Sequence, residues 1–251
     1  MAIVNLEGTF TNSGKHADKQ FVFRGPPEFA KILSLSGVDA VSIANNHSFD
    51  YLQSGYKDTV NALEAEGITY FGNDYIAVKE VNGVKVGMFG FLVWNASNEN
   101  KKLIKARVEQ LKESGAQLII AYYHWGIENT NYPNAAQKTL GRYSIDIGCD
   151  LVLGSHPHVM QGIEKYKGKN IVYSLGNFCF GGNRNPSDKD TFIFQQTFTF
   201  DEGELVTDNV TSIIPVMLSS VKTRNDFQPT PAAGKDAERI LNRLKEYSAG
   251  F

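Results

Sequence analysis

Residues 151–158 read Leu-Val-Leu-Gly-Ser-His-Pro-His, a short apolar run that ends in two histidines. An apolar run of this length, closed by glycine and proline, is typical of a buried strand in an α/β protein. Four other segments also pass directly from an apolar strand into polar residues: 2–7, 40–50, 118–126 and 171–177. Because open α/β sheets bind ligands beyond the carboxyl ends of their strands, we expect these five loops to meet at one cleft.

Apolar runs that alternate with amphipathic segments predict a largely buried sheet built from βα units. The helical period marks four helices in the first 150 residues: one over 26–35 and three through Tyr56/Val60/Leu63, Ile104/Val108/Leu111 and Ala136/Leu140/Tyr143/Ile147. The pair Asn82-Gly83 predicts a hairpin turn. The expected strands are 2–4, 40–44, 84–91, 118–123, 151–153 and 171–173.

The pattern changes after residue 180. Segments 191–200 and 205–218 read as strands joined by a hairpin-like connection over 201–204. A final helix is expected over 236–247, with one apolar face formed by Ala237, Ile240, Leu241 and Leu244. No repeat or Pro/Gly/Ser-rich linker divides the chain, so we expect a single domain over 1–251.

Composition excludes some partners. The 251 residues include 25 Lys+Arg and 27 Asp+Glu, which leaves no basic field for nucleic acid or an anionic membrane surface. Cys149 and Cys179 suggest neither a disulfide framework nor a paired metal site. No apolar run approaches the length of a membrane span. The chain opens directly on a core strand, so we expect a preceding segment that could carry an anchor or export signal.

The histidines are concentrated at the strand ends. Four of the five, His47, His124, His156 and His158, lie in the expected cleft loops, and His16 lies elsewhere. Together with Asn46 and Glu7 they form a mixed nitrogen and oxygen donor set, which indicates a hydrolytic metal centre. Taken singly, each residue has a simpler explanation: a hydrogen-bonded core histidine, a turn asparagine or an ion-paired carboxylate. Their shared position at strand ends favours the metal hypothesis.

Two other chemistries are less well supported. Ser155 follows a strand and a glycine but lacks the G-x-S-x-G elbow of a serine nucleophile. The His156-x-His158 pair is compatible with a TIM-barrel amidohydrolase, but such a barrel needs eight βα units, and here hairpin-like strands follow the pair.

The strand-end motifs resemble one known family. They are Asn5-Leu6-Glu7-Gly8, Ala44-Asn45-Asn46-His47 with Asp50, His124-Trp125-Gly126, Gly154-Ser155-His156-Pro157-His158 and Tyr173-Ser174-Leu175-Gly176-Asn177-Phe178. In this order, across nearly the whole chain, they resemble the CapA/PgsA family of bacterial poly-γ-glutamate capsule biosynthesis. That family lies in the calcineurin-like metallophosphoesterase superfamily.

The resemblance implies an α/β four-layer sandwich, with central mixed sheets flanked by helices and a two-metal site at the strand ends. It implies that His124 and His156 bind one metal, that His158 binds the other, that Asn46 is a ligand, and that Glu7 stands where the superfamily has a bridging aspartate. The family's opening Gly-Asp strand is missing here, so the first site is expected to be incomplete. The ions implied are Mn, Fe or Zn.

The resemblance also implies a mechanism in which metal-bound hydroxide attacks a phosphoester or γ-glutamyl amide and His47, with Asp50, protonates the leaving group. Here Asn45 replaces the motif's glycine, and Asp50 does not directly follow the histidine. We expect Asn45, Trp125 and Asn177 to contact substrate.

The alternative function is that of a non-catalytic assembly or export component whose cleft binds polymer or a partner. Anionic polymer or phosphoester and membrane proteins of capsule synthesis are the expected partners, and an extracytoplasmic, membrane-anchored parent protein is implied.

Overall fold

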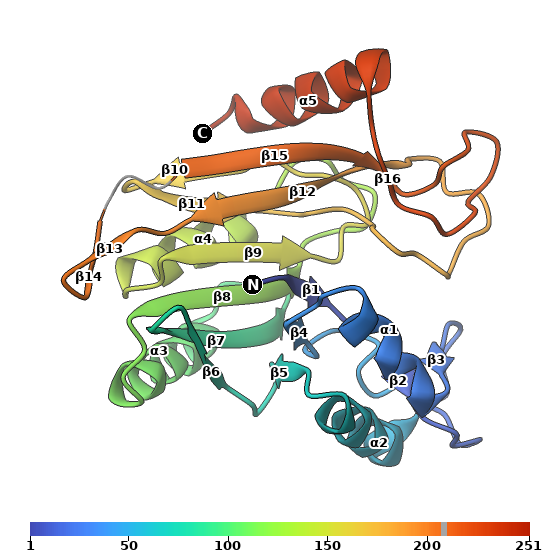
Figure 1. The fold of residues 1–251 in the computed structure, drawn as a ribbon, viewed down its shortest axis with the longest axis horizontal. Helices are drawn as coiled ribbons and strands as arrows, with labels where there is room; N and C mark the ends of the chain where they lie inside the picture. The colour runs from blue at the N-terminus through green and yellow to red at the C-terminus, as the bar shows by residue number, and fades with distance from the viewer. Residues whose placement is uncertain (207–209) are drawn as a thin grey trace.

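The computed structural model describes residues 1–206 and 210–251. Its largest sheet has the order β10-β11-β9-β8-β7-β6 (Figure 1). The four inner strands run parallel, and the two outer strands are antiparallel to their neighbours. The strands are β6 (Ala77–Val81), β7 (Val84–Val93), β8 (Leu118–Trp125), β9 (Leu151–Ser155), β10 (Ile163–Tyr166) and β11 (Lys169–Val172).

Two three-stranded sheets form a second layer. One is parallel, with order β1-β4-β5: β1 (Ile3–Asn5), β4 (Ala40–Ser42) and β5 (Thr69–Phe71). The other is antiparallel, with order β12-β15-β16: β12 (Asp190–Thr197), β15 (Val210–Met217) and β16 (Thr230–Pro231). Two short ribbons complete the strands: β2 (Thr9–Phe10) with β3 (Arg24–Gly25), and β13 (Phe200–Asp201) with β14 (Glu204–Leu205).

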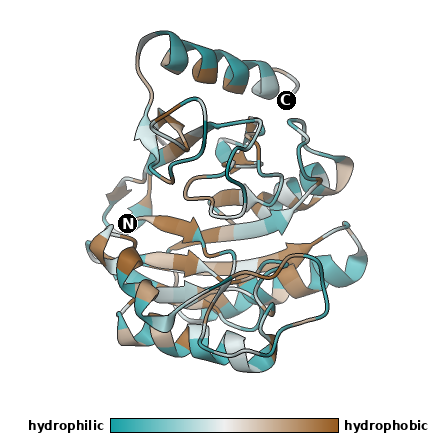
Figure 2. Cartoon of the chain, turned by 90° about the vertical axis from the view of Figure 1, so that its right-hand side faces the viewer, coloured by the Kyte–Doolittle hydropathy of each residue, from teal (hydrophilic) through white to brown (hydrophobic). Residues whose placement is uncertain are grey.

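Three apolar cores define four layers. The first core joins α3 (Asn98–Glu113) and α4 (Ala135–Asp146) to one face of the six-stranded sheet. The second lies between the large sheet and the smaller sheets, and α5 (Gly234–Ser248) adds to it. The third joins the parallel β1-β4-β5 sheet to α1 (Ala30–Leu35), which a short 3₁₀ turn precedes (Pro27–Phe29), and to α2 (Leu52–Ala65). This is the layered α/β metallophosphoesterase-like fold that the family resemblance implied. Figure 2 shows brown, hydrophobic residues along the strands in the middle of the molecule.

Strand β8 lies at the centre of this arrangement, and all eight of its residues are buried. Because successive side chains of a strand point to opposite faces, Tyr123 and Trp125 enter the core under the helices. Ile120 and Tyr122 enter the core between the sheets. The same alternation places His124 on the side of the smaller sheets, where β1 and β4 end.

Most predicted elements are confirmed with small shifts in their ends, including the Asn82-Gly83 hairpin between β6 and β7. The expected hairpin-like connection over 201–204 is confirmed, because β12 and β15 pair antiparallel and residues 201–204 form the tip of the small β13-β14 ribbon that lies between them in the sequence. Residues 207–209, part of the predicted strand 205–218, lie outside the described residues. Within the described ranges, no helix is long and apolar enough to cross a bilayer.

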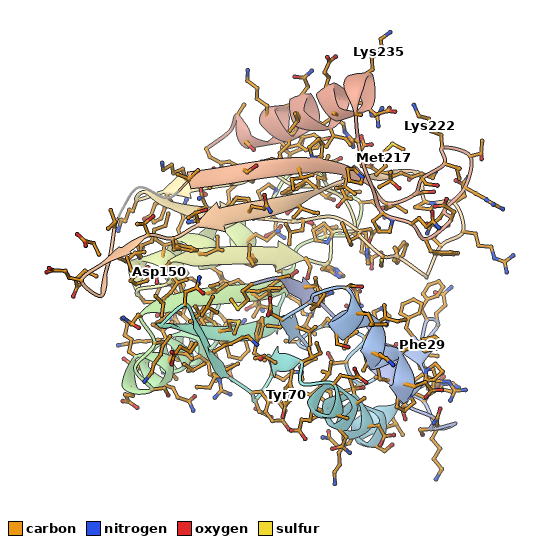
Figure 3. All side chains as sticks on the ribbon, viewed as in Figure 1. Phe29, Tyr70, Asp150, Met217, Lys222 and Lys235 are labelled. Atoms are coloured by element: carbon orange, nitrogen blue, oxygen red, sulfur yellow. The ribbon has the colours of Figure 1, made fainter. Side chains whose placement is uncertain are left out.

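The apolar face of α5 is narrower than predicted. Ile240 is fully buried and Leu244 nearly so, whereas Leu241 is 41% exposed. The outer side of the helix carries polar residues: Figure 3 shows Lys235, at the start of α5, pointing away from the sheets. Two neighbouring residues of similar size therefore make unequal contributions to the docking of the helix.

Ile240→Ala is expected to destabilise the protein by about 2–4 kcal/mol, since it leaves a cavity under α5. Leu241→Ala is the matched control, and it should change the unfolding free energy by less than about 1 kcal/mol. Urea unfolding followed by circular dichroism measures both. Equal effects at the two positions would contradict the observed docking of α5.

Candidate metal centre

The expected cleft lies where strands of both layers end. Glu7 follows β1, His47 follows β4, His124 lies in β8, and His158 follows β9. The Glu7 Oε1 atom lies 4.0 Å from His47 Nε2, 3.7 Å from His124 Nε2 and 3.8 Å from His158 Nε2. Residues far apart in sequence therefore direct one carboxylate oxygen and three imidazole nitrogens into a common space.

His156 joins this cluster through His124. Its Nδ1 atom lies 3.1 Å from His124 Nε2, and the other nitrogen of His124 is 3.0 Å from Ser155 Oγ. Burial lowers the pKa of His124 well below its usual value. Burial, together with the nearby His158 ring, lowers the pKa of His156 to about 4. Both rings are therefore neutral at pH 7, the form that binds a metal ion.

The backbone at the two histidines after β9 is strained. His156 has a φ of 97° and His158 a φ of 59°, in a region that side chains other than glycine rarely adopt. Such conformations cost roughly 1–3 kcal/mol each and are concentrated at functional sites. His158 is also held by Asn177: Nδ1 lies 2.9 Å from the Asn177 amide oxygen, and the amide nitrogen donates to the His158 carbonyl. Asn177 therefore orients an imidazole directly, and its second amide N–H and second oxygen lone pair are not used by these two hydrogen bonds.

His47 is held by Asp50, which is completely buried. The Asp50 Oδ2 atom lies 2.8 Å from His47 Nδ1 and also accepts a hydrogen bond from the Phe23 backbone N–H. Lys19 forms an ion pair with the other carboxylate oxygen and donates to the Asn46 carbonyl. Because Nδ1 is engaged, the ring presents Nε2 towards Glu7, the orientation that an acid–base residue at this cleft requires.

The two asparagines before His47 are placed differently. The Asn45 amide donates to Asn5 and Leu6 and accepts from the His47 backbone N–H, so its hydrogen bonds lie within the protein. The Asn46 Oδ1 atom is buried and has no hydrogen-bond partner among the described residues. The structure thus gives Asn45 a role in shaping the loop and leaves Asn46 with a free acceptor.

Trp125 does not reach the cleft. Its side chain is 1% exposed, stacks on Tyr123, and donates from Nε1 to the Tyr173 carbonyl at 2.8 Å. The strand alternation of β8 places it on the face opposite His124. This position does not support the expectation that Trp125 contacts substrate, and its role here is packing beneath the site.

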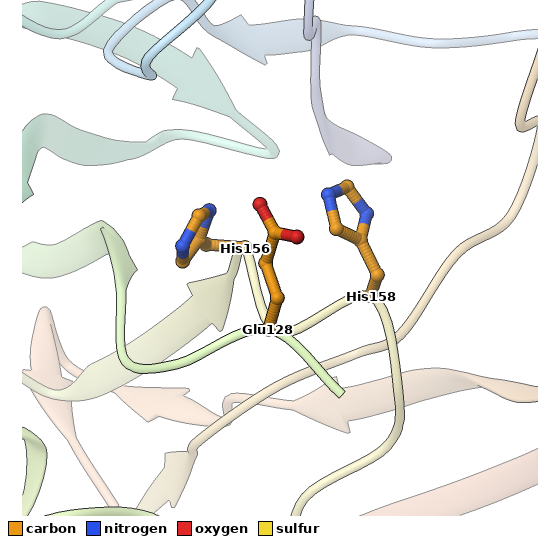
Figure 4. Close-up of side chains that lie close together, drawn as sticks. All are labelled: Glu128, His156 and His158. Atoms are coloured by element: carbon orange, nitrogen blue, oxygen red, sulfur yellow. The ribbon is translucent and has the colours of Figure 1, made fainter. Parts of the chain in front are cut away.

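The sequence interpretation missed Glu128, Trp94, Lys19 and Phe23. Trp94 follows β7 and packs edge-on against His156, with ring centroids 4.8 Å apart. One ligand atom from each of Glu128, His156 and His158 lies within 4.8 Å of the others (Figure 4). An acidic residue four positions after His124, in the same strand-end loop, was the available signal for Glu128. Lys19 and Phe23 come from a long loop without a periodic pattern and gave no such signal.

The donor atoms fit a divalent cation. Ligands held about 2.0–2.2 Å from one zinc-like ion lie roughly 3–4 Å from one another, and Glu7 Oε1 lies 3.7 Å from His124 Nε2 and 3.8 Å from His158 Nε2, so this oxygen is close enough to share an ion with either ring. That oxygen and Asn46 Oδ1 are buried without a hydrogen-bond partner among the described residues. Burial also raises the pKa of Glu7, a penalty that an adjacent cation would remove. Buried acceptors normally have partners, so these two free oxygens agree with metal ligation.

The comparisons with known proteins concern most of the chain. The family model described as "Bacterial capsule synthesis protein PGA_cap" matches residues 1–182. The "Capsule biosynthesis protein CapA" of Bacillus anthracis is 31% identical over 93% of this chain and 60% of its own length. The "PGA biosynthesis protein CapA" of Bacillus subtilis (strain 168) is 32% identical over 68% of this chain and 50% of its own length.

A more distant relative matches the whole chain. It is the "Probable polyglutamine synthesis accessory protein MT0602" of Mycobacterium tuberculosis (strain CDC 1551 / Oshkosh), which is 25% identical over 73% of its length. The alignments with the two Bacillus relatives thus cover only 50–60% of those proteins.

Proposed function

The chain belongs to the PGA_cap family of bacterial capsule synthesis proteins, and we propose that it acts in poly-γ-glutamate capsule synthesis as a metal-dependent hydrolase. The proposed ligands are Glu7, Asn46, His124, His156 and His158. One observation carries the proposal: a buried Glu7 oxygen without a hydrogen-bond partner in the described chain lies within 3.8 Å of the Nε2 atoms of two proposed ligands, His124 and His158. A domain that only binds polymer has no evident need for this arrangement.

The bond proposed to be cleaved is a phosphoester or a γ-glutamyl amide. When bound, divalent ions would supply Lewis-acid polarisation of the scissile group and lower the pKa of a water molecule. The side chains of the protein orient the group that donates the proton. Asp50 fixes the His47 ring so that Nε2 faces the cleft, where it can give a proton to the leaving group. Phe23 lies against that ring, with centroids 4.4 Å apart, and covers one side of it.

The proposal also places this domain outside the cytoplasmic membrane, beside membrane proteins of capsule synthesis. Its substrate there would be the anionic polymer or a phosphoester. A non-catalytic part in polymer assembly or export is the alternative, in which the same cleft binds polymer.

Metal analysis and hydrolysis assays together test the proposal. Protein purified without added metal is expected to contain one to two equivalents of Mn, Fe or Zn by elemental analysis. The chelated protein, reloaded with each ion, should hydrolyse bis-p-nitrophenyl phosphate or shorten poly-γ-glutamate. Protein that neither retains nor takes up any of these ions would refute the metal centre. Metal binding with no hydrolysis of either substrate would favour the assembly role.

A further inference from the structure

Glu128 lies at the edge of the cleft, beside His156 and His158. It follows β8 and is exposed, and one carboxylate oxygen lies within 4.8 Å of ligand nitrogens of His156 and His158. Figure 4 shows the carboxylate directed into the space between the two rings. Among residues 1–206 and 210–251, the hydrogen bond found at Glu128 goes from Thr130 Oγ1 to the Glu128 backbone carbonyl, which leaves the carboxylate available to an ion. The three ligand atoms lie within 4.8 Å of one another, an upper limit close to the roughly 3–4 Å that separates ligands of one ion, so at most a small rotation of the exposed Glu128 side chain would bring its carboxylate onto an ion held by the two histidines.

The fold holds the Glu128 loop against the histidine loop. The Asn129 backbone N–H donates to the Pro157 carbonyl at 2.8 Å, and the Asn131 side chain donates to the Met160 carbonyl at 3.0 Å. In the other direction, the fully buried Gln161 donates to the Thr130 carbonyl at 2.7 Å. Three hydrogen bonds between the two loops therefore fix where Glu128 stands relative to His156 and His158.

We propose that Glu128 is a further ligand of the ion held by His156 and His158, an inference that rests on the proposed metal centre. The five ligands already named contain one anionic side chain, Glu7, against up to two divalent ions. A second carboxylate would reduce the uncompensated positive charge and supply the oxygen donor that harder cations such as Mn²⁺ prefer. Its exposure places this ligand at the solvent side of the cleft.

Mn²⁺ titration of the metal-stripped full chain by isothermal calorimetry tests the inference. Glu128→Gln and Glu128→Ala are expected to weaken binding at one site by at least about 10-fold. Glu109→Gln, at an exposed position on α3, is the matched control and should bind Mn²⁺ like wild type. Wild-type affinity in both Glu128 variants would overturn ligation by Glu128 and leave the proposed function intact. A wild-type chain that binds no Mn²⁺, Fe²⁺ or Zn²⁺ would overturn both.

Repeating the titration at high salt distinguishes direct ligation by Glu128 from a long-range electrostatic effect of its charge. At about 1 M salt the Debye length is roughly 3 Å, so attraction between separated charges is largely screened, whereas a ligand bond persists. The affinity ratio of wild type to Glu128→Gln should therefore stay at about 10-fold or more between 0.1 M and 1 M KCl. A ratio that falls to about 1 at high salt would refute direct ligation. Unchanged melting of the metal-free variants would exclude a general loss of structure.

Discussion

His156→Gly is expected to abolish metal-dependent hydrolysis while leaving the metal-free fold about as stable as wild type. The change removes a proposed ligand, so metal affinity should fall by at least about 100-fold. It also relieves the backbone, because the φ of 97° at this position suits glycine. A relief of roughly 1–3 kcal/mol offsets the loss of the buried imidazole. Elemental analysis, hydrolysis assays and thermal melting of the stripped protein measure the three effects.

Asn46→Ala provides an independent second variant. It removes a buried oxygen without a hydrogen-bond partner in the described structure, so the metal-free protein should lose little stability, while metal binding should weaken. His16→Ala is the control, since His16 lies outside the histidine cluster and its ring contacts Tyr51 and the Ala17 carbonyl. Variants of His156 and Asn46 that retain wild-type metal content and activity would refute the ligand assignment.

Gly154→Ala is expected to destabilise the protein by about 3 kcal/mol or more. A Cβ at this position would lie 2.2 Å from the Tyr173 carbonyl oxygen and 2.5 Å from Trp125 Nε1. These two atoms are the partners of a buried hydrogen bond. Overpacking of a core costs roughly 1–3 kcal/mol, and a buried donor left without its acceptor costs a similar amount. Position 154 requires glycine because β9 passes so close to the hydrogen bond between Trp125 and Tyr173 that no side chain fits there.

Gly181→Ala is the matched control for Gly154→Ala. Within the described part of the chain, no atom lies within 4 Å of a Cβ built at Gly181, and its φ is not in the left-handed region. Its melting temperature should stay within about 2 °C of wild type, whereas Gly154→Ala should lower it by about 6–12 °C. A drop of less than 2 °C for Gly154→Ala would show that the core around Trp125 yields more easily than the structure indicates.

The sequence predicted the fold class because both periodicities are strong in this chain. The apolar strand 118–123 became the fully buried β8, and the helical stripe Ile104/Val108/Leu111 became the buried face of α3. Less regular segments were missed. Strands β2 and β3 have two residues each, too few for a periodic pattern to be visible.

Some predicted site residues are placed by the strand end that they follow, and others are placed by contacts with distant parts of the chain. Glu7, His47, His124, His156 and His158 come directly from strand ends, and the structure brings them together. Whether they bind metal stays a prediction until an ion is measured. For Asn45, which follows the same kind of strand end, the hydrogen bonds that engage its amide reach back to residues 5 and 6. Whether a loop side chain points into the cleft or into the protein therefore depends on partners that are distant in the sequence.

The sequence by itself determined which strands and helices form and which loops carry nitrogen and oxygen donors, because these depend on periodicity and on residue chemistry over short stretches. Only the tertiary structure decided that Trp125 turns from the cleft, that Leu241 stays exposed and that Glu128 reaches His156 and His158. Each of these depends on how two sheets and their loops pack against one another. That packing is set by the burial of apolar faces from segments far apart in the chain, such as those that carry Ala40 and Leu244. Local periodicity holds no information about which distant segments meet.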